Sequence, residues 1–175
     1  MSFPTSSWPR GRARDGGIDR VPLPAGVRGS LYLCGKHALA PDVEAVIESL
    51  GVTTVVCLTE RHELGERYPA YVSWLDANIG ELALWMPIPD LHAPQADDIV
   101  TLLADVRARL ERGGTVLVHC AAGIGRAGTL ATCLLITMGM DAGEALAHVA
   151  AHRPMAGPEV GAQRTLVDAI AGLAR

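Results

Sequence analysis

Cys120 and Arg126 have the residue types and the spacing of a nucleophile and an anion-binding clamp. Five residues separate them, and the loop lies between a β-branched, apolar run and an apolar run of helical spacing. An α/β sheet binds ligands where a strand ends and a helix begins, because the unpaired N–H groups of the helix attract anions. A thiol in such a field ionises readily. We therefore predict that Cys120 is a thiolate poised to attack a bound phosphoryl group.

The residues between Cys120 and Arg126 favour the binding of that anion. Gly123 and Gly125 allow the backbone to turn so that successive amides point inward. The planar guanidinium of Arg126 can hold two phosphate oxygens at once. The predicted phosphate-binding residues are Ala121, Ala122, Gly123, Ile124, Gly125 and Arg126. A buried, inert cysteine is the ordinary alternative at the end of a strand, but it explains neither the glycines nor the arginine.

The leaving oxygen of a phosphate ester needs a proton, so a carboxylic acid must reach it. Asp90 lies 30 residues before Cys120, just after a predicted strand and beside two prolines. We predict that Asp90 is the general acid. Asp97 and Asp98 are rivals, but they precede a run of helical spacing and are typical of helix caps.

The run 119–126, His-Cys, five residues and Arg, resembles the signature of the protein tyrosine phosphatase superfamily. The pattern from residue 31 onward is similar to the dual-specificity branch, and residues 87–90 with the later helices resemble kinase-associated phosphatase. The resemblance covers about residues 30–173. It implies a phosphoprotein phosphatase of tyrosine or dual specificity that forms a phosphocysteine on Cys120, without cofactor or metal. Its implied substrates are proteins carrying phosphotyrosine, or also phosphoserine and phosphothreonine.

The same resemblance implies further roles. His119 is expected to hold the loop of Cys120 in place. Gln163 is expected to position the hydrolytic water, with a helix-surface amide as the alternative. Arg61 is either a substrate contact at the rim of the site or part of a solvated charge cluster. Cys57 is expected near Cys120, so it is either an inert thiol or a partner in the reversible disulfide that some relatives use for redox control.

The sequence departs from the family at Ala127, where Ser or Thr usually follows the signature arginine. That hydroxyl normally helps the cysteine sulfur to leave, so hydrolysis of the phosphocysteine is expected to be slow. Thr129 is two residues further on, and its hydroxyl need not point at the sulfur. A phosphoprotein-binding pseudophosphatase with weak turnover is therefore an alternative. A sulfurtransferase is a third interpretation, which the histidine, the five-residue gap and Asp90 disfavour. The neutral loop residues favour a monophosphate ester over a polyanionic lipid head group.

Strands alternate with helices along the chain, which predicts an α/β fold with a central, mainly parallel sheet flanked by helices. The predicted strands are 30–34, 53–58, 82–88 and 115–119. The predicted helices are 41–50, 68–79, 96–112, 126–138, 142–152 and 158–173. Residues 1–28, rich in Gly, Pro, Ser and Arg, are predicted to form a loosely ordered arm. Residues 29–175 are then the dual-specificity-phosphatase-like catalytic domain.

Composition narrows the function classes. The 175-residue chain has a net charge of −4, and only 4% of its residues are aromatic, which disfavours nucleic-acid binding. No apolar run approaches the roughly 20 residues of a membrane span. The four cysteines, Cys34, Cys57, Cys120 and Cys133, form no close pair, so neither a disulfide framework nor structural zinc is expected. We predict a cytoplasmic protein, with Cys34, Cys57 and Cys133 as inert thiols.

Overall fold

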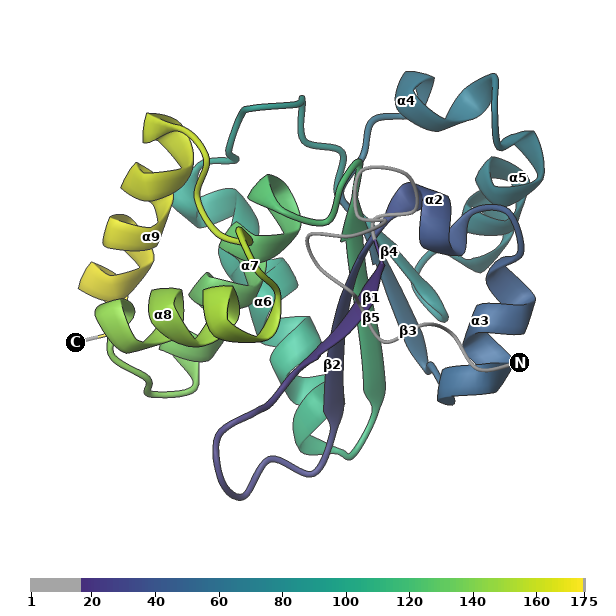
Figure 1. Cartoon of the computed structure of the whole chain (residues 1–175). Helices are drawn as coiled ribbons and strands as arrows, with labels where there is room; N and C mark the ends of the chain where they lie inside the picture. Colours follow the sequence, from purple (N-terminus) through teal and green to yellow (C-terminus); the bar gives the residue numbers. More distant parts are fainter. Residues whose placement is uncertain (1–16, 175) are drawn as a thin grey trace.

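The computed structural model describes residues 17–174 and shows an α/β fold built on one sheet (Figure 1). Within these residues the sheet has five strands in the order β1-β2-β5-β3-β4. Four run parallel, and β1 is antiparallel to its neighbour β2. The strands are β1 (Ile18–Val21), β2 (Ser30–Gly35), β3 (Thr54–Cys57), β4 (Ala83–Trp85) and β5 (Thr115–Cys120). The predicted fold class, a mainly parallel sheet flanked by helices, is confirmed.

Helices cover both faces of the sheet (Figure 1). One face packs against α6 (Ala96–Glu111), α7 (Gly125–Thr137), α8 (Ala142–His152) and α9 (Gly161–Leu173). The other face packs against α3 (Val43–Leu50) and α5 (Pro69–Asn78). Because side chains alternate along a strand, Val116 and Val118 of β5 face the first group of helices and Leu117 faces the second. The central strand β5 is thus buried on both faces, which explains its uninterrupted run of apolar residues.

The structure differs from the predicted elements mainly before residue 30 and around two short helices. Residues 1–16 lie outside the described residues, but the expected loosely ordered arm is wrong for residues 18–21. Ile18 and Val21 are buried and β1 pairs with β2, so two apolar side chains were enough to add an edge strand in a polar, glycine-rich stretch. The short helices α2 (Lys36–Leu39) and α4 (His62–Gly65) were also missed, because four residues carry no detectable periodicity.

The topology places the end of β5 between the ends of β2 and β3. Gly35 of β2 lies opposite Cys120, and Cys57 of β3 lies opposite His119. The loops that follow these three parallel strands therefore meet at one edge of the sheet. None of the helices within residues 17–174 has the length and apolar character needed to cross a membrane.

Candidate active site

The loop from Cys120 to Arg126, called here the Cys120 loop, joins β5 directly to α7. Its tightest point is Gly123, which adopts φ +71°. A Cβ atom there would lie 2.3 Å from the backbone carbonyl carbon and oxygen of Cys34. Only glycine meets both constraints, because other residues are strained at positive φ and would displace β2. This packing turns the N–H of Gly123 toward the sulfur of Cys120, at 3.2 Å.

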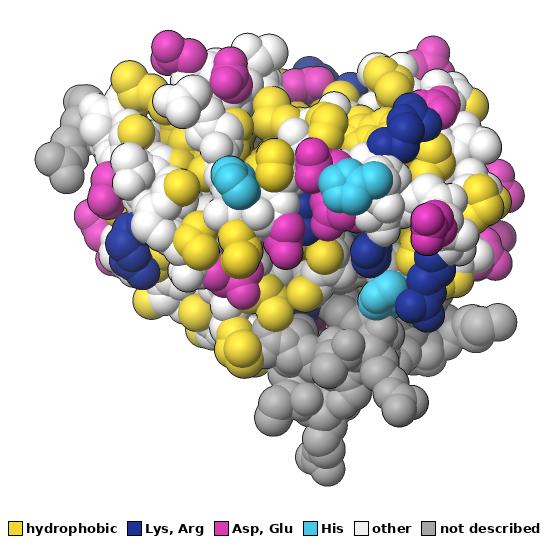
Figure 2. Space-filling model, turned by 90° about the horizontal axis from the view of Figure 1, so that it is seen from above, with side chains coloured by type: hydrophobic (Ala, Val, Ile, Leu, Met, Phe, Trp, Pro, Cys, Tyr) yellow, Lys and Arg dark blue, Asp and Glu magenta, His cyan; other side chains and the backbone are white. Residues whose placement is uncertain are grey.

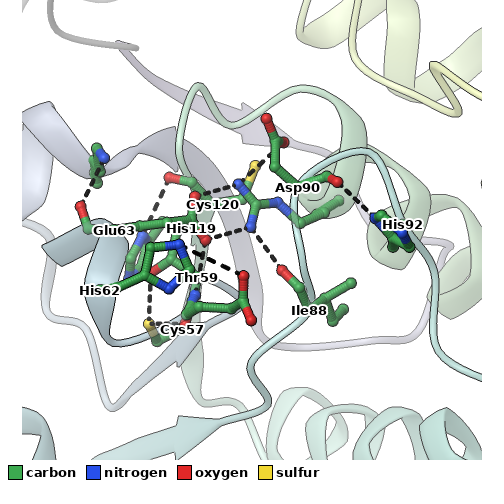
Figure 3. Close-up of polar contacts among 12 residues, drawn as sticks. Cys57, Thr59, His62, Glu63, Ile88, Asp90, His92, His119 and Cys120 are labelled. Atoms are coloured by element: carbon green, nitrogen blue, oxygen red, sulfur yellow. Dashed lines mark hydrogen bonds and ion pairs between the residues drawn. The ribbon is translucent and has the colours of Figure 1, made fainter.

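Arg126 is held by three residues from other parts of the chain. Figure 3 shows these residues, Glu63 of α4 with Ile88 and Asp90, grouped near Cys120. Its Nη1 and Nη2 donate to the two carboxylate oxygens of Glu63 at 2.7 and 2.8 Å. Nη1 also donates to the carbonyl of Ile88 at 2.7 Å. Nη2 lies 3.3 Å from Oδ1 of Asp90. The guanidinium is therefore fixed in orientation at the loop, with a carboxylic acid candidate on one of its nitrogens.

The Arg126–Glu63 pair keeps both groups charged. Burial alone would lower the pKa of Arg126, but the hydrogen bonds with Glu63 and the charges of Cys120, Glu63 and Asp90 together outweigh it and raise that pKa above its ordinary value. Burial would likewise raise the pKa of Glu63, and the bonds from Arg126 and the N–H of Glu60 hold it below its ordinary value instead. A fixed, permanently positive fork at the start of a helix is suited to bind a dianion such as a phosphate ester.

Asp90 lies on the loop after β4, and 68% of its side chain is exposed. Its own carbonyl accepts a hydrogen bond from Nδ1 of His92 at 2.7 Å, and Leu91 between them has φ +59°. Such a conformation is uncommon for leucine and occurs at functional sites more often than elsewhere. The loop therefore carries Asp90 on a tight, strained turn above the Cys120 loop.

The rival carboxylates occupy a different place. Asp97 and Asp98 lie in the first turn of α6, where the N-cap residue is Gln95. Their predicted role as caps is wrong in detail, since neither is the N-cap, but acidic groups in a first turn stabilise the helix dipole. Of these three carboxylates, Asp90 alone contacts Arg126 within the described part of the chain.

His119 is buried directly before Cys120. Its Nδ1 lies 3.4 Å from the carbonyl of Cys120 and its Nε2 lies 2.7 Å from the hydroxyl of Tyr71. Burial lowers the pKa of His119 to about 4, so the ring is neutral at neutral pH and one nitrogen carries a proton while the other accepts. The side chain thus ties the end of β5 to α5, the kind of contact expected of a residue that holds the loop.

Gln163 is not the helix-surface amide given as an alternative, because only 1% of it is exposed. Its Oε1 accepts from the N–H of Glu159 at 2.8 Å, and its Nε2 donates to the carbonyl of His92 at 3.2 Å. It also lines a small cavity together with Arg126 and Thr129. Gln163 therefore links α9 to the loop of Asp90, and its predicted role toward water stays a prediction.

Arg61, expected to be either a substrate contact at the rim or part of a solvated charge cluster, is paired with Asp76 on the surface. Its guanidinium bonds both oxygens of Asp76, at 2.9 and 2.6 Å, and lies over the ring of Trp85. The adjacent α4 instead supplies Glu63 to Arg126. Glu63 and Tyr71 are the site residues that the sequence analysis missed, since a single glutamate or tyrosine far from the loop carries no local signal.

The remaining cysteines are buried thiols. Burial raises the pKa of Cys34 and of Cys133 to about 12 and that of Cys57 to about 11, which keeps all three protonated. Cys57 contacts the hydroxyl of Thr59 at 3.2 Å. Every cysteine of the described residues is free, and the disulfide of Cys57 with Cys120 stays an untested hypothesis.

The surface around the site is acidic and apolar rather than basic. Figure 2 looks down on the face beyond the carboxyl ends of the strands, where Asp, Glu and His side chains gather near the middle with hydrophobic side chains between them. Lys and Arg side chains are few on the described part of this face. Among the residues that the structure describes, the positive charge that would meet a phosphate comes from Arg126 and from backbone amides rather than from a basic patch.

Comparisons with known proteins agree with this geometry. Residues 27–169 match the family described as "Swiss Army Knife protein, DSP-PTPase phosphatase domain". Human dual specificity protein phosphatase 14 is 35% identical over 85 residues, which cover 47% of this chain and 43% of that protein. Mouse tyrosine-protein phosphatase non-receptor type 13 is 43% identical over 53 residues, 30% of this chain and 2% of that protein. The chain thus spans less than half the length of these relatives.

Solved structures resemble the whole fold. Tk-PTP in its active form has a TM-score of 0.68 and 25% identity, covering 88% of this chain and 97% of its own. Kinase associated phosphatase, with its catalytic-site cysteine replaced by serine, has a TM-score of 0.74 and 20% identity, covering 90% and 94%. The second likeness concerns the fold alone.

Proposed function

Because the chain belongs to the DSP-PTPase phosphatase domain family, in the dual-specificity branch of the protein tyrosine phosphatase superfamily, we propose that it is a cysteine-dependent phosphoprotein phosphatase. The observation that carries the proposal is the convergence of Cys120, Arg126 and Asp90 at the start of α7. A phosphorylated protein is the proposed substrate. The neutral side chains of the Cys120 loop suit a single phosphate ester, because nothing among them would meet additional phosphates.

The proposed reaction has two steps, both at phosphorus. In the first, the Cys120 thiolate forms the S–P bond while the P–O bond to the substrate breaks, and Asp90 protonates the departing oxygen. Arg126 and the loop amides stabilise the charge on the equatorial oxygens. In the second, water attacks phosphorus, Asp90 takes its proton, and the S–P bond breaks to release phosphate and the thiolate. Gln163, which is tied to the loop of Asp90, is the proposed positioning residue for that water.

Hydrolysis of a panel of phosphopeptides tests the proposed function. We expect vanadate-sensitive release of phosphate from phosphotyrosyl peptides, and the same peptides with phosphoserine or phosphothreonine report whether specificity is dual. Absence of release from all three, with correctly folded protein, contradicts the proposal. Thiosulfate-to-cyanide transfer measured on the same preparation would instead indicate the sulfurtransferase interpretation.

The role of Asp90 is expected to depend on the leaving group. Asp90→Asn removes the proton donor, so kcat for a phosphotyrosyl peptide should fall by about 10²–10³. An aryl phosphate whose phenol is a strong acid needs little protonation, and its kcat should fall far less. Asp97→Asn and Asp98→Asn are the matched controls and should leave both rates near wild type. An equal loss on both substrates would contradict general-acid catalysis by Asp90.

Hydrolysis of the phosphocysteine, the second step, is expected to be slow because residue 127 is an alanine. Ala127 is fully buried in the same apolar cluster as Cys120. No side-chain hydroxyl at this position assists departure of the sulfur. Rapid-quench measurements should show a burst of aryl alcohol followed by slower turnover. Ala127→Ser should raise steady-state turnover by about tenfold, the effect of one added hydrogen bond of ~1.4 kcal/mol.

A matched control for Ala127→Ser is Ala131→Ser, which adds a hydroxyl one turn further along α7, also at a fully buried position. It should leave the burst and the turnover as in wild type. A wild type without a burst, together with no gain in Ala127→Ser, would show that the second step is not limiting. Nothing in the comparisons favours the alternative of a phosphoprotein-binding pseudophosphatase with weak turnover. Tight binding of phosphopeptides together with only weak turnover would support that alternative.

A further inference from the structure

The outward-facing carbonyls of the Cys120 loop are held by donors from other parts of the fold. The backbone N–H of Lys36 donates to the carbonyl of Ala121 at 3.1 Å. The side chain of Arg153 holds the next two carbonyls: Nη2 donates to Ala122 at 3.0 Å and Nε to Gly123 at 2.5 Å. Three successive carbonyls are therefore fixed from the side opposite to the predicted anion.

Arg153 is a fully buried arginine, with 0% of its surface exposed. Its Nη1 donates to the carboxylate of Asp19 on β1 at 2.7 Å and to the carbonyl of Leu33 on β2 at 3.3 Å. A buried guanidinium is costly unless its donors are satisfied and its charge is paired. Hydrophobic residues would fill the same space at a lower cost in desolvation free energy. The buried charge and the planar guanidinium of Arg153 therefore indicate a functional role.

Peptide geometry supplies that reason. The carbonyl of one residue and the N–H of the next belong to the same planar, trans peptide and point in opposite directions. Holding the carbonyl of Ala122 therefore aims the N–H of Gly123, and that N–H is the one 3.2 Å from the sulfur of Cys120. Holding the carbonyl of Gly123 aims the N–H of Ile124 in the same way. Arg153 thus fixes the peptide whose N–H faces the Cys120 sulfur and also the peptide that follows it.

We propose that Arg153, anchored by Asp19, is a positioning residue that orients the amides of Gly123 and Ile124 toward the Cys120 sulfur and the bound phosphate. It touches neither, and it acts through two peptide planes. The role rests on the proposed function of the Cys120 loop. It also makes β1, the antiparallel edge strand of the sheet, part of the support of the active site.

Charge supports the same assignment. Burial lowers the pKa of Arg153, and the neighbouring Cys34, Asp19 and Cys120 oppose that shift, so the guanidinium stays cationic near the nucleophile. The titratable and charged groups that surround Cys120 are Arg126 with Glu63 and Asp90, His119, Cys34, and Arg153 with Asp19. Variants must therefore separate the position of Arg153 from its charge.

Arg153→Lys keeps the charge but replaces the fork by one ammonium, which cannot hold both carbonyls in fixed geometry. We expect the inhibition constant for inorganic phosphate to rise about tenfold, the loss of roughly one charge-assisted hydrogen bond. Alkylation of Cys120 by iodoacetamide at pH 6 should slow by about tenfold. Arg112→Lys, on the exposed surface after α6, is the matched control and should change neither. Unchanged phosphate affinity and alkylation in Arg153→Lys would overturn the proposal.

Asp19→Ala gives a second test, in which a pure charge effect and the proposed anchoring of Arg153 predict opposite changes in the alkylation rate of Cys120. Removing a carboxylate near the loop would, by charge alone, favour the thiolate and speed alkylation at pH 6. If Asp19 acts by anchoring the Arg153 fork, alkylation instead slows and phosphate binds more weakly. Faster alkylation in Asp19→Ala would overturn the proposal, and this variant decides the question where Arg153→Lys fails to fold.

Both measurements separate this inference from the proposed function. Alkylation and protection by inorganic phosphate need no turnover, so they report on the Arg153 variants even for a protein that hydrolyses no phosphopeptide. Suppose that the wild type hydrolyses no phosphopeptide, but phosphate protects Cys120 from alkylation and the Arg153 variants weaken that protection. This result would contradict the proposed phosphatase activity and support the positioning role of Arg153. If the wild type hydrolyses phosphopeptides and the Arg153 and Asp19 variants match it in alkylation rate and phosphate affinity, the phosphatase activity is supported and the positioning role is contradicted.

Discussion

Replacing Cys120 with serine is expected to abolish turnover while leaving phosphopeptide binding in place. Serine fills nearly the same volume at a position that is 3% exposed, so the loop, its amides and Arg126 keep their arrangement. A serine hydroxyl is a much weaker acid and a poorer nucleophile than a thiol, so the attack on phosphorus is lost. We expect kcat to fall by at least about 10⁴, as for other nucleophile knockouts. Calorimetry should still show binding of a phosphotyrosyl peptide, with a dissociation constant at or above the KM of wild type, because accumulation of the phosphocysteine lowers that KM below the true dissociation constant.

A matched control distinguishes the nucleophile from a cysteine that only fills space. Cys133 is fully buried in α7, and Cys133→Ser should retain turnover even if it unfolds at a lower temperature. Turnover in Cys120→Ser above a hundredth of the wild-type rate would reject Cys120 as the nucleophile. Loss of turnover in both variants would indicate that the Cys120 loop is disturbed by any change in the core, and Cys120→Ser would then not identify the nucleophile.

Arg126→Lys is expected to lower kcat/KM by about 10³, because one ammonium cannot reproduce two parallel hydrogen bonds to phosphate. The charge stays, so the loss measures the geometry of the fork. The carbonyl of Ile88 and both carboxylate oxygens of Glu63 would share one donor group. We therefore also expect the free energy of unfolding to fall by about 1–3 kcal/mol, measured by urea denaturation.

Two further variants separate catalysis from stability in Arg126→Lys. Glu63→Gln keeps an acceptor for Arg126 and removes its charge, so it should lower stability with a much smaller loss of kcat/KM. Arg164→Lys, on the exposed side of α9, should change neither quantity. A kcat/KM within tenfold of wild type in Arg126→Lys would show that a point charge is enough and that the predicted bidentate clamp is wrong.

The part of the site that could be predicted from the sequence is the part that is continuous along the chain. β5, the Cys120 loop and α7 follow one another within residues 115–137, so strand pattern, glycines and arginine all reinforce one interpretation. The strong helical spacing of residues 96–112 and the β-branched run 53–58 likewise fixed α6 and β3 to within a residue or two. Local chemistry and local periodicity were enough in each case.

The supporting residues were missed because their function exists only after folding. Glu63 reaches Arg126 across 63 positions, and Tyr71 reaches His119 across 48. Each is an ordinary member of its own segment, so its composition and spacing predict only a surface or core residue. Arg153 directly follows a predicted helix and belongs to no local motif, although in the folded protein it is fully buried and holds two carbonyls of the Cys120 loop. Such roles follow from packing, which a single sequence does not encode locally.

The distance along the chain between Asp19 and Arg153, 134 positions, bears on when the protein becomes reactive. During synthesis the run His119 to Arg126 leaves the ribosome before residue 153 does, so the nucleophile exists before its amides can be aimed. Contacts between distant segments form late, since the entropy of a long loop must be overcome first. A nascent or partly unfolded chain would then carry only an ordinary thiol. Folding itself would act as the last activation step, and the appearance of a reactive Cys120 would report a completed domain.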